Sequence, residues 1–221
     1  MDIFLNTCVS CNKRILASKN LFCLECNGRL PRTYFNFSEN NIVLEKLKLH
    51  IPLRAAGSFL YYNQNEMVKE ILWEMKYNNN KELAVEMGRM AASGQEKMFL
   101  ETAEAIIPIP LHKTKLRIRG YNQTECFANG LHEVTGIPLM TDQFKRTKKT
   151  SSQTKLNRQD RFQNLDNAFA IEDESKIQGK HVLLLDDVIT TGATLISAGQ
   201  AILDAGCASL SIYTLATAFE L

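Results

Sequence analysis

The sequence contains no long apolar run, and its charges of opposite sign nearly cancel. No window approaches the roughly 18 uninterrupted apolar residues that a membrane-spanning helix needs, which argues against a membrane span. The first residues, MDIFLNTCVSCNKRIL, lack the apolar segment of a signal peptide. With 45% hydrophobic and 23% charged residues among 221, the chain is not a disordered tail. We expect a cytoplasmic protein without a membrane span, formed by one ordinary domain with a small appendage or by two small domains.

Several well-known site motifs are also missing. The chain has no G-x-x-x-x-G-K-[ST] and no G-x-G-x-x-G, which excludes the two common glycine-rich phosphate loops. It has no H-E-x-x-H and no G-x-S-x-G, which argues against a zinc protease and a serine hydrolase of those types. There is no internal repeat or low-complexity tract.

Basic residues gather in the middle of the chain although the formal net charge is only +2. Residues 112–161 contain eleven Lys and Arg against four acids, a local charge of +7. Such a segment favours a phosphate-rich ligand, although a run of basic side chains is more often a solvated surface.

Four of the six cysteines form two C-x-x-C pairs, Cys8 with Cys11 and Cys23 with Cys26. Two such pairs complete a tetrahedral shell for one metal ion, and a segment of about 30 residues needs that metal to fold. We predict a structural Zn²⁺ site. Disulfides are disfavoured because nothing marks the chain as secreted, and a redox pair because neither pair opens a helix after a strand. The ribbon contacts either nucleic acid or the main domain.

Apolar periodicity predicts an α/β protein with a central, mainly parallel sheet buried on both faces by helices. We divide the chain into a Cys₄ ribbon at 1–32, a connector at 33–53 and an α/β domain at 54–221. The expected elements are helix 42–49, strand 54–62, helices 68–75 and 81–100, strand 104–110, helix 122–134, short strands near 139 and 168–171, strand 180–186, helix 193–204 and strand 209–216.

A turn rich in threonine follows the apolar strand 180–186. In a parallel sheet ligands bind at the carboxyl ends of the strands, and the amides that start the next helix bind anions. Two adjacent carboxylates there suit the hydroxyls of a ribose with a nearby Mg²⁺. The alternative is an acidic strand end before an ordinary helix. The predicted phosphate and ribose site comprises Asp186, Asp187, Thr190, Thr191, Gly192, Ala193 and Thr194.

A second predicted ligand segment follows the strand 104–110. Arg117, Arg119 and Asn122 are candidates for binding pyrophosphate, because arginine binds phosphate oxygens in pairs. The alternative for this segment is an exposed basic loop that contributes only solubility. The polar and basic stretch 146–161 has no apolar periodicity and is expected to order on a ligand.

VLLLDDVITTGAT resembles the signature by which type I phosphoribosyltransferases bind phosphoribosyl pyrophosphate (PRPP). Together with the Cys₄ ribbon, PIPLHKTKLRIRGYNQTE and RTKKTSSQTKLNRQDRFQNLDNAF, nearly the whole chain is similar to the ComF family of competence proteins. The resemblance implies the type I fold, with PRPP bound through Mg²⁺, Asp186 and Asp187 on the ribose, and 190–194 on the 5′-phosphate. It also places 146–161 as the loop that closes over the site, with Arg146, Lys149 and Gln153 as catalytic candidates.

Two function classes follow. The first is an enzyme that transfers phosphoribosyl from PRPP to a nitrogen acceptor; a glutaminase step is doubtful, because Cys8 is already assigned to zinc. The second is a non-catalytic protein of DNA uptake or recombination that binds single-stranded DNA or senses PRPP or another ligand containing ribose 5-phosphate. Its partners would be DNA and the proteins of DNA uptake or recombination.

Overall fold

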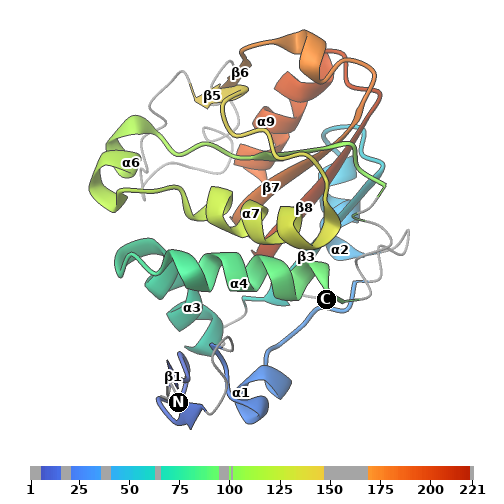
Figure 1. Ribbon diagram of the computed structural model, residues 1–221. Helices are drawn as coiled ribbons and strands as arrows, with labels where there is room; N and C mark the ends of the chain where they lie inside the picture. Colours follow the sequence, from blue (N-terminus) through green and yellow to red (C-terminus); the bar gives the residue numbers. More distant parts are fainter. Residues whose placement is uncertain are drawn as a thin grey trace, which may run out of the picture.

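A parallel sheet forms the centre of the protein. The computed structural model describes residues 6–15, 21–35, 41–62, 66–94, 100, 102–146 and 169–219. The strand order is β3 (Ala55–Tyr61), β8 (Ser209–Thr217), β7 (His181–Ile189) and β4 (Ala105–Pro108), all parallel (Figure 1). A single bridge between Ile106 and Leu139 extends this order beyond β4. The expected α/β architecture is confirmed.

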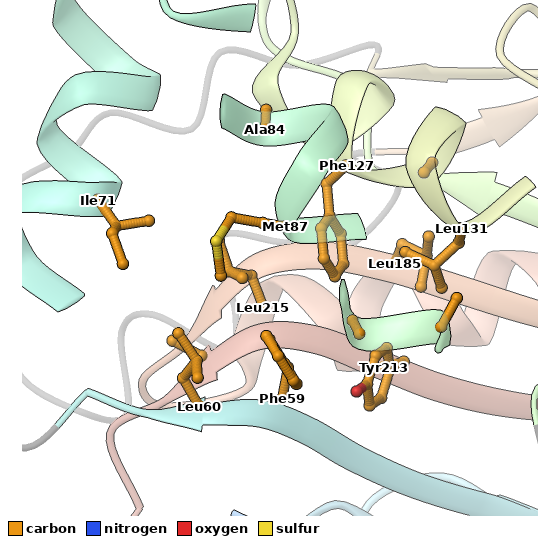
Figure 2. Packing of buried hydrophobic residues seen from close by; sticks show 14 of the residues in the cluster. Phe59, Leu60, Ile71, Ala84, Met87, Phe127, Leu131, Leu185, Tyr213 and Leu215 are labelled. Carbon is orange, nitrogen blue, oxygen red and sulfur yellow. The ribbon is translucent and has the colours of Figure 1, made fainter. Parts of the chain in front are cut away.

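Helices cover both faces of the sheet. Because side chains of a strand alternate between its faces, neighbouring residues of one strand pack against different helices. Leu183 and Leu185 of β7 pack in one cluster with residues of α3 (Glu66–Tyr77), α4 (Lys81–Ala92) and α7 (Gln123–Thr135). Figure 2 shows Leu185 in this cluster with Met87, Phe127 and Leu131. Val182 and Leu184 belong to a second cluster, with residues of α2 (Ile42–Lys48) and α9 (Ala193–Asp204).

Smaller elements complete the described chain. The cysteine ribbon holds β1 (Asn6–Thr7), β2 (Arg14–Ile15) and α1 (Leu24–Gly28). An antiparallel pair is formed by β5 (Phe144–Arg146) and β6 (Phe169–Ile171), and a 3₁₀ turn, η1, follows at Glu174–Lys176. No helix among these described residues is long and apolar enough to cross a membrane.

Two element boundaries and one whole helix differ from expectation. The helix expected to reach residue 100 ends at Ala92, and β7 runs three residues past Asp186 because Val188 and Ile189 still pair with β8. The basic segment after Pro110, expected as a loop, contains helix α6 (Lys113–Arg119). This helix starts at the cap residue His112 and ends at Gly120, whose φ of +76° suits glycine. It has no buried residue, so it leaves no apolar periodicity in the sequence.

The stretch expected as a connector packs into the domain. Within α2, Val43, Leu44 and Leu47 are buried in the second cluster, and Asn41 caps the helix while donating to the Ala56 carbonyl at 2.7 Å. Buried ribbon residues, Cys8 among them, also belong to the first cluster. The division at 32 and 53 stays a prediction.

Two glycines let α4 and α7 approach closely. A Cβ on Gly130 would lie 2.0 Å from the Val85 carbonyl oxygen, and one on Gly88 would lie 2.1 Å from that of Phe127. Both obstacles are backbone atoms, so a methyl group would push the helices apart. We expect Gly130→Ala to lower the free energy of unfolding by about 1–3 kcal/mol, measured by urea denaturation.

Gly28→Ala is the matched control for this prediction, because a Cβ there meets nothing within 4 Å. Equal unfolding midpoints for the two variants would show that the α4–α7 contact tolerates a larger separation.

Candidate functional site

The turn between β7 and α9 forms a small hollow at the carboxyl end of the central sheet. Its lining includes Asp186 together with the whole predicted segment 190–194. Gly192 is the cap residue of α9, with a φ of +80°, and a Cβ there would lie 2.8 Å from Leu47 Cδ2. The turn therefore brings together the predicted phosphate residues in a conformation that favours glycine.

The start of α9 is suited to an anion. Helices α2, α4, α6 and α7 each begin with a side chain that accepts a hydrogen bond from the first turn, whereas Gly192 has no side chain to do so. The first turn of α9 has no acid, and Thr191 Oγ1 accepts only a long bond, 3.4 Å, from the Ala193 amide. Amides at this end of a 12-residue helix carry partial positive charge, so the turn can bind a phosphate.

Asp186 and Asp187 have different surroundings. Neighbouring residues of a strand point to opposite faces, and only Asp186 of the two lines the hollow. The Asp186 carboxylate accepts the Asp187 amide at 2.8 Å. The structure thus groups one of the two acids with the phosphate turn, and the prediction that both bind a ribose stays a prediction.

Asp187 is buried, 9% exposed, and forms the centre of a polar network. Its Oδ2 lies 2.8 Å from Lys76 Nζ and accepts a 2.7 Å bond from Gln123 Nε2, while Oδ1 accepts the Val188 amide at 2.7 Å. Burial acts to raise the pKa of Asp187, but Lys76, Gln123 and the Val188 amide together lower it below its usual value. The carboxylate is therefore held ionised between α3 and α7.

The other predicted ligands lie on α6 and at the start of α7, beside this network. Arg119 donates to Gln123 Oε1 at 2.9 Å, and its guanidinium sits 5.5 Å from the Tyr77 ring centre. Arg117 and Arg119 line a groove with Lys76 and Tyr77. Asn122 is 2% exposed and caps α7 while donating to the Ile109 carbonyl at 3.0 Å, so its contacts are those of a structural cap.

Sequence reasoning missed Lys76 and Gln123. Lys76 follows the buried Met75 at the end of α3, where a basic residue is ordinary, and Gln123 starts α7 beside its cap. Their importance comes only from the fold, which places both against Asp187. Of the predicted catalytic candidates, Arg146 ends β5, whereas Lys149 and Gln153 lie outside the described residues.

The four ribbon cysteines converge. The Sγ atoms of Cys8, Cys11, Cys23 and Cys26 all lie within 4.8 Å of one another, and none forms a disulfide. The Cys11 and Cys23 sulfurs are 3.7 Å apart, close to the edge of about 3.8 Å that four Zn–S bonds of about 2.3 Å give a tetrahedron.

Backbone amides support this cluster. The Cys23 amide donates to Cys8 Sγ at 3.3 Å. Burial acts to raise the pKa of both buried thiols; backbone donors nevertheless lower the pKa of Cys8 to about 6, whereas burial and the neighbouring thiols raise that of Cys26 to about 12, so the cluster needs a cation to hold four thiolates together. The residues fit a structural zinc ion, as predicted.

Comparisons with known proteins agree with this geometry. Residues 126–219 match the phosphoribosyl transferase domain family. Competence protein F of Haemophilus influenzae is 38% identical over 120 residues, which cover 54% of this chain and 52% of that protein. Competence protein ComFC of Bacillus subtilis is 26% identical over 209 residues, 94% of this chain and 82% of that protein. The chain is similar to the ComF competence proteins, as its sequence indicated.

The chain has the type I phosphoribosyltransferase fold that its sequence predicted: the matched domain contains β7, the threonine turn, α9 and β8. Among solved structures, a glutamine PRPP amidotransferase from B. subtilis is 16% identical with a TM-score of 0.42, covering 65% of this chain and 30% of that one. The chain spans about half the length of its H. influenzae relative.

Proposed function

We propose that this protein binds PRPP with Mg²⁺ at the β7–α9 turn and acts in DNA uptake. The observation that carries the proposal is the hollow that joins Asp186 to the uncapped start of α9. The phosphoribosyl transferase match covers that turn, and the relatives' names supply the link to competence.

Each part of PRPP has a proposed partner. The 5′-phosphate binds the amides and hydroxyls of 190–194, and the ribose hydroxyls lie against Asp186 and Asp187. We propose that Asp186, which lines the hollow, shares Mg²⁺ with the ligand, because Mg²⁺ is usually held by one or two carboxylates plus phosphate oxygens. The pyrophosphate lies toward Arg117 and Arg119, on the Lys76 side of the network.

The reaction that fits these groups is displacement at the anomeric carbon. The bond from that carbon to the pyrophosphate oxygen breaks, a bond to an acceptor nitrogen forms, and pyrophosphate leaves. Arg146, Lys149 and Gln153 are proposed to close over the site and exclude water from the cation-like centre. Ribose binding is the first role proposed for Asp186 and Asp187. The second is that one of them acts as the base that takes the acceptor's proton.

A second candidate is a non-catalytic protein of DNA uptake that senses PRPP or binds single-stranded DNA. The competence names of the relatives favour it, because they describe a process and not a reaction. The enzyme and the PRPP sensor both require the β7–α9 turn to bind PRPP, whereas a protein that only binds single-stranded DNA does not. PRPP binding is therefore the first property to test.

We expect calorimetry to show Mg²⁺-dependent PRPP binding that Thr191→Ala weakens about tenfold or more, since a hydrogen bond to a charged group contributes about 1.5–3 kcal/mol. Thr191 is a better target than Asp187, whose replacement would also release Lys76. Thr141→Ala, at an exposed threonine that does not line the hollow, is the matched control. Equal affinities for the two variants would contradict the proposed phosphate site.

A further inference from the structure

A second hollow lies between α3 and α6. It encloses about 470 Å³, within the range of small-molecule sites, and its lining includes Tyr77, Lys81, Arg117 and Arg119. Lys76 also lines it, so the groove reaches the network around Asp187. Neither the zinc site nor the β7–α9 turn accounts for the aromatic residues found here.

Exposed aromatic rings mark this part of the surface. Trp73 and Tyr77 stand one turn apart on α3, are 53% and 63% exposed, and have ring centres 6.1 Å apart. Leu116 and Ile118 on α6 are exposed as well, so four of the seven large apolar side chains exposed in the described residues lie on these two helices. Apolar surface gathered in this way usually marks a binding site.

Cations surround the rings. Helix α6 has four basic residues and no acid, and none of its residues is buried. Lys81 also lines the groove, and its ammonium lies 5.3 Å from the centre of the Tyr121 ring. Lys76 is already paired with Asp187, and Arg119 with Gln123 and Tyr77, whereas Arg117 and Lys81 are exposed cations on the lining.

We propose that the α3–α6 groove binds a nucleotide unit, with the base stacked on Trp73 or Tyr77 and the phosphates on Arg117 and Lys81. Aromatic rings beside a positively charged groove recognise any base through its flat face and any backbone through its charge. This nucleotide unit is either a free nucleotide or part of a single-stranded nucleic acid. The inference goes beyond PRPP binding, but the two ligands share Arg117: the pyrophosphate proposed above lies toward the same residue, so PRPP and the nucleotide unit are expected to compete there.

Trp73 is the only tryptophan of the chain, and its ring centre lies 6.1 Å from that of Tyr77 on the groove lining, so its fluorescence reports on a base that stacks at this edge of the groove. The probes are a thymidine octanucleotide, thymidine 5′-monophosphate and inorganic phosphate. We expect saturable quenching by at least one of the two nucleotide probes and none by inorganic phosphate. A response to the octanucleotide alone identifies a strand as the occupant, and equal responses identify a free nucleotide.

Two variants test the parts of the site. Tyr77→Ala is expected to weaken binding about 5- to 150-fold, the range measured for loss of one stacked base. Tyr34→Ala is its matched control, because Tyr34 is also 63% exposed and does not line the groove. For a strand, Arg117→Ala is expected to flatten the dependence of log affinity on log salt by about 0.7, and Lys48→Ala on α2 to leave it unchanged.

Quenching by inorganic phosphate as strong as by the nucleotides, no quenching at all, or equal affinities of Tyr77→Ala and Tyr34→Ala would overturn the proposal. Failure here is distinguishable from failure of the PRPP site. Thr191→Ala is expected to lose PRPP and keep the Trp73 response, and Tyr77→Ala to do the reverse.

Discussion

Replacing Lys76 with Met is expected to lower the free energy of unfolding by about 3 kcal/mol at pH 7, near the low end for breaking a buried ion pair. The variant keeps the length of the side chain but leaves the Asp187 carboxylate, 9% exposed, without its cation. Gln123 and the Val188 amide still donate hydrogen bonds to the carboxylate, so it stays in place. Its negative charge is then buried without a neighbouring positive charge. Urea denaturation at pH 7 measures the loss.

The same pair predicts a pH dependence. Because the pKa of Asp187 is lowered in the folded protein, its contribution is present above the unfolded value of about 3.9 and is lost as pH falls through the folded pKa. In Lys76→Met, burial raises the pKa of Asp187, which protonates and relieves the penalty in acid. The stability difference between the two proteins should therefore be largest near neutral pH and shrink below about pH 4.

Lys69→Met on the same helix is the control. Lys69 pairs with Glu66 at 2.8 Å, but the two side chains are 40% and 84% exposed, and exposed pairs contribute little. Equal free energies of unfolding for Lys76→Met and Lys69→Met would show that Lys76 does not stabilise the buried Asp187 carboxylate.

Loss of the metal should have the largest effect on the ribbon. We expect Cys26→Ser to reduce bound zinc from about one ion per chain to almost none, because a closed four-cysteine site loses a quarter of its ligands. The apparent binding free energy of structural zinc, about 10–16 kcal/mol, is also the folding energy of such a small unit. Residues 6–35 should then become sensitive to protease, while the sheet remains folded.

Metal analysis and limited proteolysis measure both outcomes. Cys207→Ser is the matched control, because Cys207 is half-buried and does not belong to the cluster. A chelator added to the unaltered protein should reproduce the cleavage pattern of Cys26→Ser. Full zinc content in Cys26→Ser would show that the four sulfurs do not form one metal site.

Local signals explain what could be predicted from the sequence. The strand before Asp186, the threonine turn and helix α9 are contiguous in the chain, so their composition and order indicate both the structure and the phosphate chemistry. The cysteine spacing likewise predicted that four sulfurs converge. Most helices and strands were placed within a few residues, because each has an apolar face that repeats with its own period.

The remaining features depend on contacts between distant segments. Asp187 and Lys76 are 111 positions apart, and nothing in either neighbourhood indicates that the sheet edge and the end of α3 meet at 2.8 Å. The exposed helix α6 was missed because periodicity detects only helices with a buried face. Asn122 stays a predicted ligand, and its burial as the cap of α7 against the Ile109 carbonyl is a contact that the sequence does not indicate.

Amide chemical shifts of the β7–α9 turn test the central claim most directly. In ¹H–¹⁵N spectra, PRPP with Mg²⁺ is predicted to move the amide signals of Gly192, Ala193 and Thr194 most strongly, because these groups would donate to the 5′-phosphate. The Thr141 amide should stay in place. Shifts confined to other segments, or none at saturating PRPP, would contradict the assignment of this turn as the phosphate site.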